Sequence, residues 1–325
     1  MKGLATVFGG SGFVGAQIVR ALAKGGWRVR VAVRQPGRGY RLRMLGDVGQ
    51  IEIVQANIRN AASVDRALEG AEACINAVAV LYEHGRQSFQ ALHVEGARQV
   101  ALAAAAHGVG RLVHISAIGA DANSPSAYAR SKAAGEAAVR AVAPFAAIVR
   151  PSVVFGADDN FFNRFAAMAV VSPALPLIGG GVTLFQPVFV SDVAAAVAAA
   201  LAPSATGLTY ELGGPMAYSF RRLMELMLAE IRRERLLVPI PFALARIIGL
   251  AGEILALTPL PPPITSDQVN LLRRDAVVTP GALGLADLGV AATAVEPVIG
   301  AYLYRYRKGG QYAEPVEAAA AAAAG

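Results

Sequence analysis

Short apolar runs alternate with segments of helical period over the first 150 residues. An apolar run of roughly four to eight residues is typical of a buried strand, and apolar positions repeating every three or four residues indicate a helix. Strands are predicted at 4–8, 28–33, 51–55, 73–77, 112–116 and 146–149. Helices are predicted at 13–23, 63–68, 89–107 and 127–142. This alternation predicts an α/β fold with a doubly wound parallel sheet covered by helices on both faces.

The pattern loosens after Pro151, where proline and glycine become frequent and the predicted helices stand apart. One helix is predicted over 220–231 with Ser219 as its N-cap, and Asp158 and Asp159 are interpreted as helix caps rather than substrate ligands. We expect a sheet domain over 1–155 and a smaller α/β lobe over 156–310 that is interleaved with late elements of the sheet. An alanine-rich tail over 311–325 follows.

Residues 236–257 form a strongly apolar stretch whose only charges are Arg246 and Glu253. These charges lie too near its centre for easy insertion across a bilayer, and no run of about 18 uncharged apolar residues is present to span one. The stretch is either an interfacial or docking helix or a buried helix of the smaller lobe. Tyrosines and basic residues at 302–308 either meet lipid headgroups or a partner, or form a solvated helix face.

Composition narrows the classes of partner. The net charge is +7, but the basic residues are scattered and lack zinc-finger spacing or an RNA-binding aromatic signature. Nucleic acid is therefore less favoured than anionic lipid or an acidic protein surface. The single cysteine, Cys74, fits a reducing compartment and is interpreted as a buried apolar residue. The four histidines are never at ligand spacing with cysteine or carboxylate, so no metal site is expected.

A glycine-rich turn, Gly9-Gly10-Ser11-Gly12-Phe13-Val14-Gly15, joins the first predicted strand to the first predicted helix. In such a turn Gly9 permits the tight bend, Gly12 lets the backbone approach a diphosphate, and Gly15 allows close helix–strand packing. The helix N-terminus provides amide donors and partial positive charge for phosphates. This context predicts a Rossmann-type dinucleotide site. The other turn residues expected at the cofactor are Ser11, Phe13 and Val14.

Arg34 stands at the end of the second predicted strand, and no acid occurs between it and Asp47. A carboxylate about 20 residues past the turn would bind a free ribose 2′-hydroxyl, whereas an arginine pairs with a 2′-phosphate. NADPH is therefore the expected cofactor, and NADH is the alternative if Arg34 is an ordinary solvated charge. Asn57 and Ile58, after the third strand, are expected to flank the adenine.

Ser116 ends the fifth predicted strand, and Tyr128 and Lys132 follow at the start of a helix. Their i, i+4 spacing places Tyr128 and Lys132 on one helix face. An ammonium beside a phenol favours the phenolate, so the pKa of Tyr128 is expected to be lowered. Tyr128 could then act as general acid or base at a carbonyl that Ser116 orients, while Lys132 also binds the nicotinamide ribose.

These features resemble the extended and atypical short-chain dehydrogenase/reductase superfamily. The segment Arg150-Pro151-Ser152-Val153-Val154-Phe155-Gly156 is similar to the superfamily's sixth-strand segment, which implies that Pro151 and Val154 lie against the nicotinamide. We also place Ala77 and Ala79, after the fourth strand, at the cofactor. Asn57 departs from the pattern, since many relatives carry aspartate there, but an amide can still bond the adenine.

Within the superfamily the chain most resembles the NADPH-binding accessory subunit of respiratory complex I, over nearly its whole length. The segments that carry the resemblance are Val113–Ser116, Tyr128–Glu136, Gln186–Val193, Pro263–Val269 and Gly284–Val290, of which the last two are the most specific. The resemblance implies a docked, largely structural subunit of the peripheral arm near the membrane. Its NADPH would take no part in electron transfer, and the Ser116, Tyr128 and Lys132 trio would be idle.

The chain starts at Met1-Lys2 and enters a strand at once, so we expect no targeting peptide and a bacterial version of this subunit. It would lie on the cytoplasmic face of the inner membrane. Two other functions remain open at this point. One is a free-standing NADPH-dependent reductase or epimerase acting on a small or quinone-like substrate, and the other is a nucleotide-sensing regulator without turnover.

Overall fold

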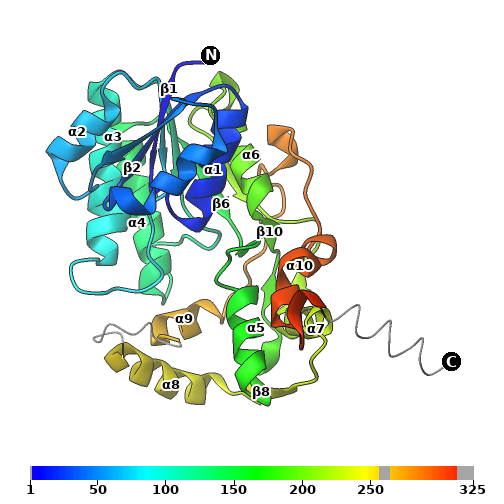
Figure 1. Ribbon diagram of the computed structural model, residues 1–325. Coiled ribbons are helices and arrows are strands. Elements are labelled where there is room, and N and C mark those ends of the chain that lie inside the picture. Colours follow the sequence, from blue (N-terminus) through cyan, green and yellow to red (C-terminus); the bar gives the residue numbers. More distant parts are fainter. Residues whose placement is uncertain (1, 256–263, 313–325) are drawn as a thin grey trace.

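A seven-stranded parallel sheet forms the upper part of the computed structural model, which describes residues 2–255 and 264–312 (Figure 1). The strands follow the spatial order β11-β6-β5-β4-β1-β2-β3, and every neighbouring pair is parallel. They are β1 Leu4–Phe8, β2 Arg28–Val33, β3 Ile51–Gln55, β4 Ala73–Asn76, β5 Arg111–Ile115, β6 Ala147–Pro151 and β11 Thr209–Leu212. The predicted doubly wound α/β sheet is confirmed.

Helices cover both faces of this sheet. Helices α1 (Phe13–Lys24) and α6 (Val190–Ala199) pack together on one face. Helices α2 (Ala61–Leu68), α3 (Gly96–Ala106) and α4 (Ala127–Val142) form a row on the other (Figure 1). Strand β11 belongs to this sheet and α6 covers it, although both come after residue 156. The second half of the chain is therefore interleaved with the sheet domain.

Two predicted helices differ from the observed ones for local reasons. Helix α2 begins at Ala61 rather than Ser63, because the Asn60 side chain accepts a hydrogen bond from the Ser63 amide and caps the helix. The predicted helix over 89–107 is a π-helix from Gln90 to Glu95 that continues into α3. Such wide turns are frequent at functional sites because they change which side chains face inward.

The smaller lobe lies below the sheet in Figure 1 and is built from short strand pairs and helices. The strand pairs are β7 with β10, β9 with β12 and β8 with β13. The elements are β7 Val154–Phe155, α5 Phe162–Val171, β8 Ala174–Ile178, β9 Leu184–Phe185, β10 Val188–Phe189, β12 Tyr218–Ser219, α7 Phe220–Glu230, β13 Leu236–Ile240, α8 Phe242–Leu255, α9 Ser266–Leu271 and α10 Glu296–Leu303. Ser219 caps α7 as predicted, since its side chain accepts from the Arg222 amide.

The apolar stretch at 236–257 divides into a strand and a helix. Strand β13 pairs with β8, and α8 follows it, while residues 256 and 257 lie outside the described residues. Leu244 and Ile247 on α8 are 51% and 65% exposed, so the helix is not buried as one of the two interpretations required. Within residues 2–255 and 264–312, no helix combines the length and apolar character needed to cross a bilayer.

The tyrosine and arginine stretch at 302–308 serves mainly to hold the lobe together. The Tyr302 hydroxyl is buried and donates to Asp159 at 2.7 Å, and Arg305 donates to Asn163. Asp159 also accepts from the amides of Phe161 and Asn163, so it satisfies amides at the start of α5 although the N-cap position itself is Phe161. The interpretation of this stretch as a solvated helix face is therefore wrong for Tyr302.

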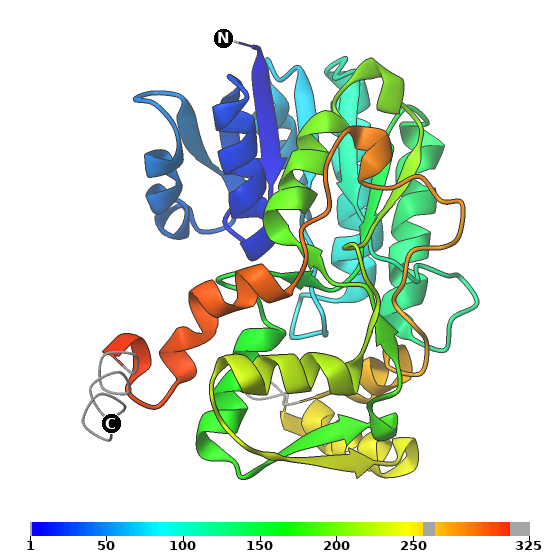
Figure 2. The same ribbon diagram turned by 90° about the vertical axis from the view of Figure 1, so that its right-hand side faces the viewer.

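Residues 264–295 run from α9 back along the sheet and join the two parts of the molecule (Figure 2). The Thr279 amide donates to Glu211 at the edge of the sheet, and Leu283 accepts from the Glu211 amide. Thr293 donates through its amide and hydroxyl to Asp192 at the start of α6. The chain thus returns to the sheet domain after it has built most of the lobe.

The contact between α4 and the π-helix requires a glycine. A Cβ at Gly135 would lie 2.2 Å from the carbonyl oxygen of His93, which is backbone and cannot rotate away. We predict that Gly135→Ala lowers the free energy of unfolding by about 1–3 kcal/mol or more through overpacking. Gly110→Ala is the control, because nothing lies within 4 Å of its Cβ position, and it should change stability by about 0.5 kcal/mol or less. Urea denaturation measures both, and equal stabilities would contradict the prediction.

Candidate functional site

The glycine turn between β1 and α1 has the geometry that a diphosphate site needs. Gly9 adopts φ +79, a region open to glycine, and a Cβ at Gly15 would lie 2.3 Å from the Gly9 carbonyl oxygen. A Cβ at Gly12 would meet only that same oxygen, at 3.4 Å. Gly12 is the N-cap of α1 and supplies no side-chain cap, so the first amides of the helix remain available to an anion.

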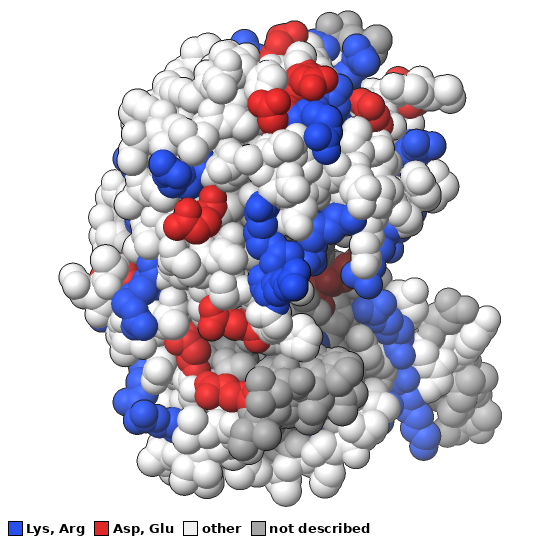
Figure 3. Space-filling view, turned by 90° about the vertical axis from the view of Figure 1, so that its left-hand side faces the viewer, with Lys and Arg blue, Asp and Glu red and all other residues white. Residues whose placement is uncertain are grey.

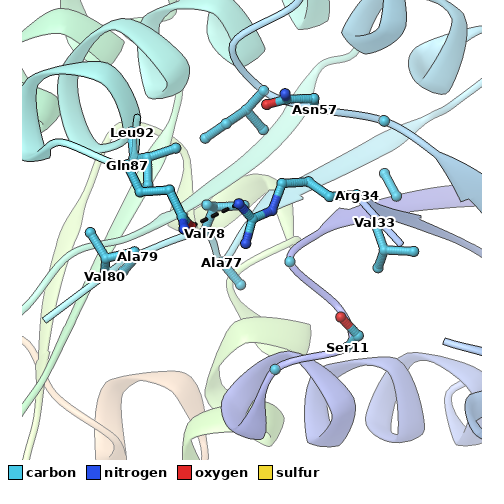
Figure 4. A pocket seen from close by; sticks show the side chains of 15 residues that line it. Ser11, Val33, Arg34, Asn57, Ala77, Val78, Ala79, Val80, Gln87 and Leu92 are labelled. Atoms are coloured by element: carbon cyan, nitrogen blue, oxygen red, sulfur yellow. Dashed lines mark hydrogen bonds between the residues drawn. The ribbon is translucent and has the colours of Figure 1, made fainter. Parts of the chain in front are cut away.

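A cavity opens directly beside this turn, at the carboxyl ends of β1, β2, β3 and β4 (Figure 4). Ligands of open α/β sheets bind at this edge. Figure 4 shows the Arg34 side chain extending across the cavity to Gln87, and its Nη1 donates to Gln87 Oε1 at 2.7 Å. The lining residues are Gly9, Ser11, Gly12, Ala32, Val33, Arg34, Ala56, Asn57, Ile58, Ala77, Val78, Ala79, Val80, Gln87 and Leu92.

Half of the predicted cofactor residues line this cavity, and half do not. Those brought together are Gly9, Ser11, Gly12, Arg34, Asn57, Ile58, Ala77 and Ala79. Those outside its lining are Phe13, Val14, Gly15, Ser116, Tyr128, Lys132, Pro151 and Val154. Lining residues that were not predicted include Gln87, which lies in an irregular loop after β4, and Val33, which was detectable as the last residue of the strand before Arg34. The cavity therefore corresponds to the adenosine and diphosphate part of the predicted site.

A second cavity adjoins the first and shares Arg34, Ala56 and Asn57 with it. Its other lining residues are Gln55, Asn60, Ser63 and Arg66. Arg66 and the polar side chains of this second cavity make the surroundings of Arg34 basic and polar, as a phosphate requires. Basic side chains also gather in the middle of one face of the molecule (Figure 3).

Tyr128 and Lys132 lie on α4, one turn apart, but their protonation differs from the sequence-based expectation. Burial raises the pKa of Tyr128 to about 12, so the expected lowering is wrong. Burial also lowers the pKa of Lys132 to about 8, and its Nζ donates to the carbonyl oxygen of Ile115 at 2.8 Å. The cost of burying both charged forms outweighs the attraction between ammonium and phenolate in this structure.

The Ser116 hydroxyl is the one buried side-chain oxygen or nitrogen without a hydrogen-bond partner among the described residues. A buried hydroxyl normally has a partner, because leaving it unsatisfied costs about 1–3 kcal/mol. Ser116 follows β5, next to the Ile115 carbonyl that Lys132 contacts. An unpartnered hydroxyl at this position fits a polar group supplied by a bound ligand.

A buried histidine, His93, packs against Tyr128 and bonds to the helix that carries it. The Val80 amide donates to Nε2 of His93 at 3.0 Å, so the ring carries its proton on Nδ1 and donates to Ser131 Oγ at 2.8 Å. Ser131 in turn donates to the Tyr128 carbonyl at 2.7 Å, and the His93 and Tyr128 rings meet edge to face. Burial, together with the Lys132 charge, lowers the pKa of His93 to about 3.

A scan against protein families matches residues 5–213 to the NAD dependent epimerase/dehydratase family. The chain belongs to this family. Its match covers the sheet domain and every residue of the cavity, and the family's description names NAD. A nicotinamide dinucleotide is therefore the class of cofactor that this family membership supports. No group of three or more metal-ligating side chains occurs in the described part of this epimerase/dehydratase chain.

Two curated relatives of this family member carry informative names. The chain is 37% identical over 94% of its length, and 79% of the relative's, to subunit 9 of the mitochondrial NADH dehydrogenase (ubiquinone) 1 alpha subcomplex of Arabidopsis thaliana. It is also 37% identical, over 54% of each chain, to the ceramide reductase of Caulobacter vibrioides. The first match covers most of the chain, so the chain belongs to the family of that subunit as well.

Solved structures confirm the epimerase/dehydratase fold. The UDP-glucose 4-epimerase of Thermus thermophilus, solved with NAD, superposes with a TM-score of 0.67. It is 19% identical, and the match covers 93% of this chain and 98% of that one. At this level of identity the likeness shows the fold alone.

The neutral His93 ring makes stability depend on pH. Because its folded pKa of about 3 lies below the ordinary 6.5, the unfolded chain binds the extra proton between these values. His93 therefore stabilises the fold above about pH 6.5 and loses that contribution as the pH falls toward 3. We predict that His93→Gln makes the unfolding free energy less steep in this window, by about 1.4 kcal/mol per pH unit. Urea unfolding at several pH values tests this, the two slopes should coincide above pH 7.5, and parallel curves throughout would contradict it.

Proposed function

We propose that the chain is an accessory, largely structural subunit of a membrane-bound NADH:quinone oxidoreductase and that it holds a tightly bound NADPH. The observation that carries this proposal is that the glycine turn and Arg34 line the same cavity. The chain that forms this cavity is 37% identical, over 94% of its length, to a named subunit of such an enzyme. NADH is the alternative cofactor.

Different residues of the chain would hold different parts of the cofactor. The diphosphate would meet the amides at the start of α1, around Gly12. Arg34 would turn from Gln87 toward the 2′-phosphate, exchanging a neutral acceptor for a charged one. Asn57 and Ile58 would bound the adenine, and Ser116, Tyr128 and Lys132 would lie at the nicotinamide, together with Pro151 and Val154. When bound, NADPH would supply a hydride donor, and nothing in the structural role requires its use.

The raised pKa of Tyr128 supports an idle site. A general acid or base works best when its pKa is near the working pH, and burial holds the pKa of Tyr128 at about 12. Lys132 already donates to a backbone carbonyl, and the Tyr128 ring packs edge to face against Phe89 and His93. These contacts favour a group that fixes a cofactor over one that exchanges protons with a substrate.

The exposed face of α8 supports docking. Leu244, Ile247 and Ile248 follow i, i+3, i+4 spacing and are all exposed, and Leu250 extends the patch. Exposed apolar stripes of this kind mark interaction surfaces. We assign α8 to contact with neighbouring subunits of the peripheral arm near the membrane, with lipid headgroups within reach and no role for nucleic acid. In a bacterial cell this position is the cytoplasmic face of the inner membrane.

A second function is favoured by one observation. The unpartnered Ser116 hydroxyl stands where a substrate carbonyl would be oriented, and one relative, 37% identical over 54% of the chain, is named a ceramide reductase. A free-standing NADPH-dependent reductase or epimerase, acting on a small or quinone-like substrate, is therefore the alternative. Steady-state NADPH oxidation by the isolated chain, abolished in Tyr128→Phe, would favour this function over the structural one.

The choice of cofactor can be tested at Arg34. We predict that Arg34→Asp weakens NADPH binding by roughly tenfold or more, because a charge-assisted bond becomes a repulsion. NADH binding should be unchanged or improved. Arg41→Asp is the matched control, since it changes the charge equally at an exposed position outside the cavity lining. Titration calorimetry with both nucleotides measures the effect, and equal binding of NADPH and NADH before and after the change would show that Arg34 does not select the cofactor.

Docking can be tested by fractionation. We predict that the native protein sediments with membrane NADH:quinone oxidoreductase activity. Leu244→Glu combined with Ile247→Glu should release it, because charges enter the apolar face of α8. Val171→Glu on α5 is the control, being 84% exposed on another helix. A native protein found only as a small soluble species would overturn the subunit assignment.

A further inference from the structure

The carboxylate of Asp267, in the smaller lobe, caps the helix that carries Tyr128 and Lys132. Asp267 Oδ1 accepts from the Ala127 amide at 2.6 Å, and Oδ2 accepts from the Tyr128 amide at 3.0 Å. Oδ2 also accepts from the Ser126 hydroxyl at 2.9 Å. The same hydroxyl accepts from the Ala129 amide and is the local N-cap of α4. The first turn of α4 is therefore held from a segment about 140 residues further along the chain.

A carboxylate is well suited to this position. The first amides of a helix have no intrahelical acceptor and carry partial positive charge, so an anion there is stabilised by both hydrogen bonding and the helix dipole. Ser126 could cap one amide unaided, and it does so at Ala129. Asp267 provides acceptors for the two preceding amides of the helix, those of Ala127 and Tyr128. No local residue of α4 performs this task, because the helix has no acidic residue in its first turn.

The segment around Asp267 is itself held in place. Thr265 and Gln268 form a reciprocal capping box at the start of α9. Ser266 donates through its amide and its hydroxyl to Glu253 of α8. At the other end of α9, the Leu272 carbonyl accepts from the Thr183 hydroxyl. The carboxylate is thus presented by an anchored helix, and that helix rests on α8.

The two halves of the dinucleotide cleft differ in their dependence on this contact. The adenosine and diphosphate half is lined by residues between 9 and 92, which end or follow the first strands of the sheet except for Leu92 on the π-helix. Tyr128 and Lys132, at the nicotinamide half, lie in the first two turns of α4, and the Tyr128 amide is itself one of the two capped amides. A shift of the α4 start would move both side chains relative to Ser116, while the glycine turn, Arg34 and Asn57 would stay in place because they follow strands of the sheet.

We propose that Asp267 is a positioning residue through which the smaller lobe sets the nicotinamide half of the cleft. This inference rests on the proposed binding of NADPH. Asp267 would also connect the lobe's docking helix α8 to the cofactor, because Glu253 of α8 bonds to Ser266 in the segment that carries Asp267. Contacts made by α8 are transmitted through α9 to Tyr128.

The test compares two ligands on the full chain. NADPH reaches both halves of the cleft, whereas adenosine 2′,5′-bisphosphate has the 2′-phosphate but no nicotinamide. Asp267→Asn keeps the size of the side chain and removes its charge. We expect it to weaken NADPH binding by roughly tenfold, the order of effect that loss of an N-cap produces. Binding of adenosine 2′,5′-bisphosphate should stay within about twofold of the wild type, and the fluorescence of bound NADPH should change.

Arg274→Ala is the matched control. Arg274 forms an ion pair with Asp121 at 2.6 Å, which also joins the two parts of the molecule close to α4 but touches no amide of that helix. It should leave the binding of both ligands unchanged. Should Asp267→Asn fail to fold, Asp267→Glu keeps the charge but displaces the carboxylate by one methylene, and the same split between ligands decides.

The possible outcomes distinguish a failure of this inference from a failure of the proposed function. A wild-type chain that binds neither ligand overturns the proposed function and this inference together. A wild-type chain that binds both, with an Asp267 variant that weakens both equally or neither, overturns the inference alone. Selective loss of NADPH affinity in the Asp267 variant, absent in Arg274→Ala, supports it.

Discussion

The cleft depends on one steric constraint, the close crossing of the first helix over the glycine turn. A side chain at position 15 would occupy the space of the Gly9 carbonyl, so α1 can begin directly at the edge of the sheet only with glycine there. The helix amides then face the edge at which all the parallel strands end. Arg34, Asn57 and Ala77 reach one cavity because each follows a strand that stops at this edge.

Burial governs the electrostatics of the deeper half of the site. It lowers the pKa values of both buried histidines, His93 and His114, well below the usual range, and the Lys132 ammonium lowers them further. Neutral imidazoles can accept as well as donate, which lets His93 connect the loop after β4 to helix α4. The same burial keeps Tyr128 protonated. The protonation of these buried side chains is therefore governed more by desolvation than by the proximity of Tyr128 to Lys132.

Much of the sheet and the adenosine half of the site could be predicted, because their signals are local. The glycine turn, Arg34 and Asn57 each stand at a fixed distance from an apolar strand, and the strand ends meet in space by topology alone. Gln87 could not be found this way, since it lies in a loop without periodicity. The pKa of Tyr128 was also beyond prediction, because i, i+4 spacing reveals the neighbour but not the burial. Asp267 acts across 140 residues, a distance at which spacing carries no information.

The position of Cys74 has a practical consequence. It lies in β4 between β1 and β5, its side chain is fully buried, and burial raises the pKa of its thiol. Only a thiolate reacts readily with alkylating reagents, and this one forms only when the middle of the sheet separates. Since the chain has no other cysteine, the rate at which a reagent modifies it reports how often the centre of the nucleotide-binding sheet opens to water.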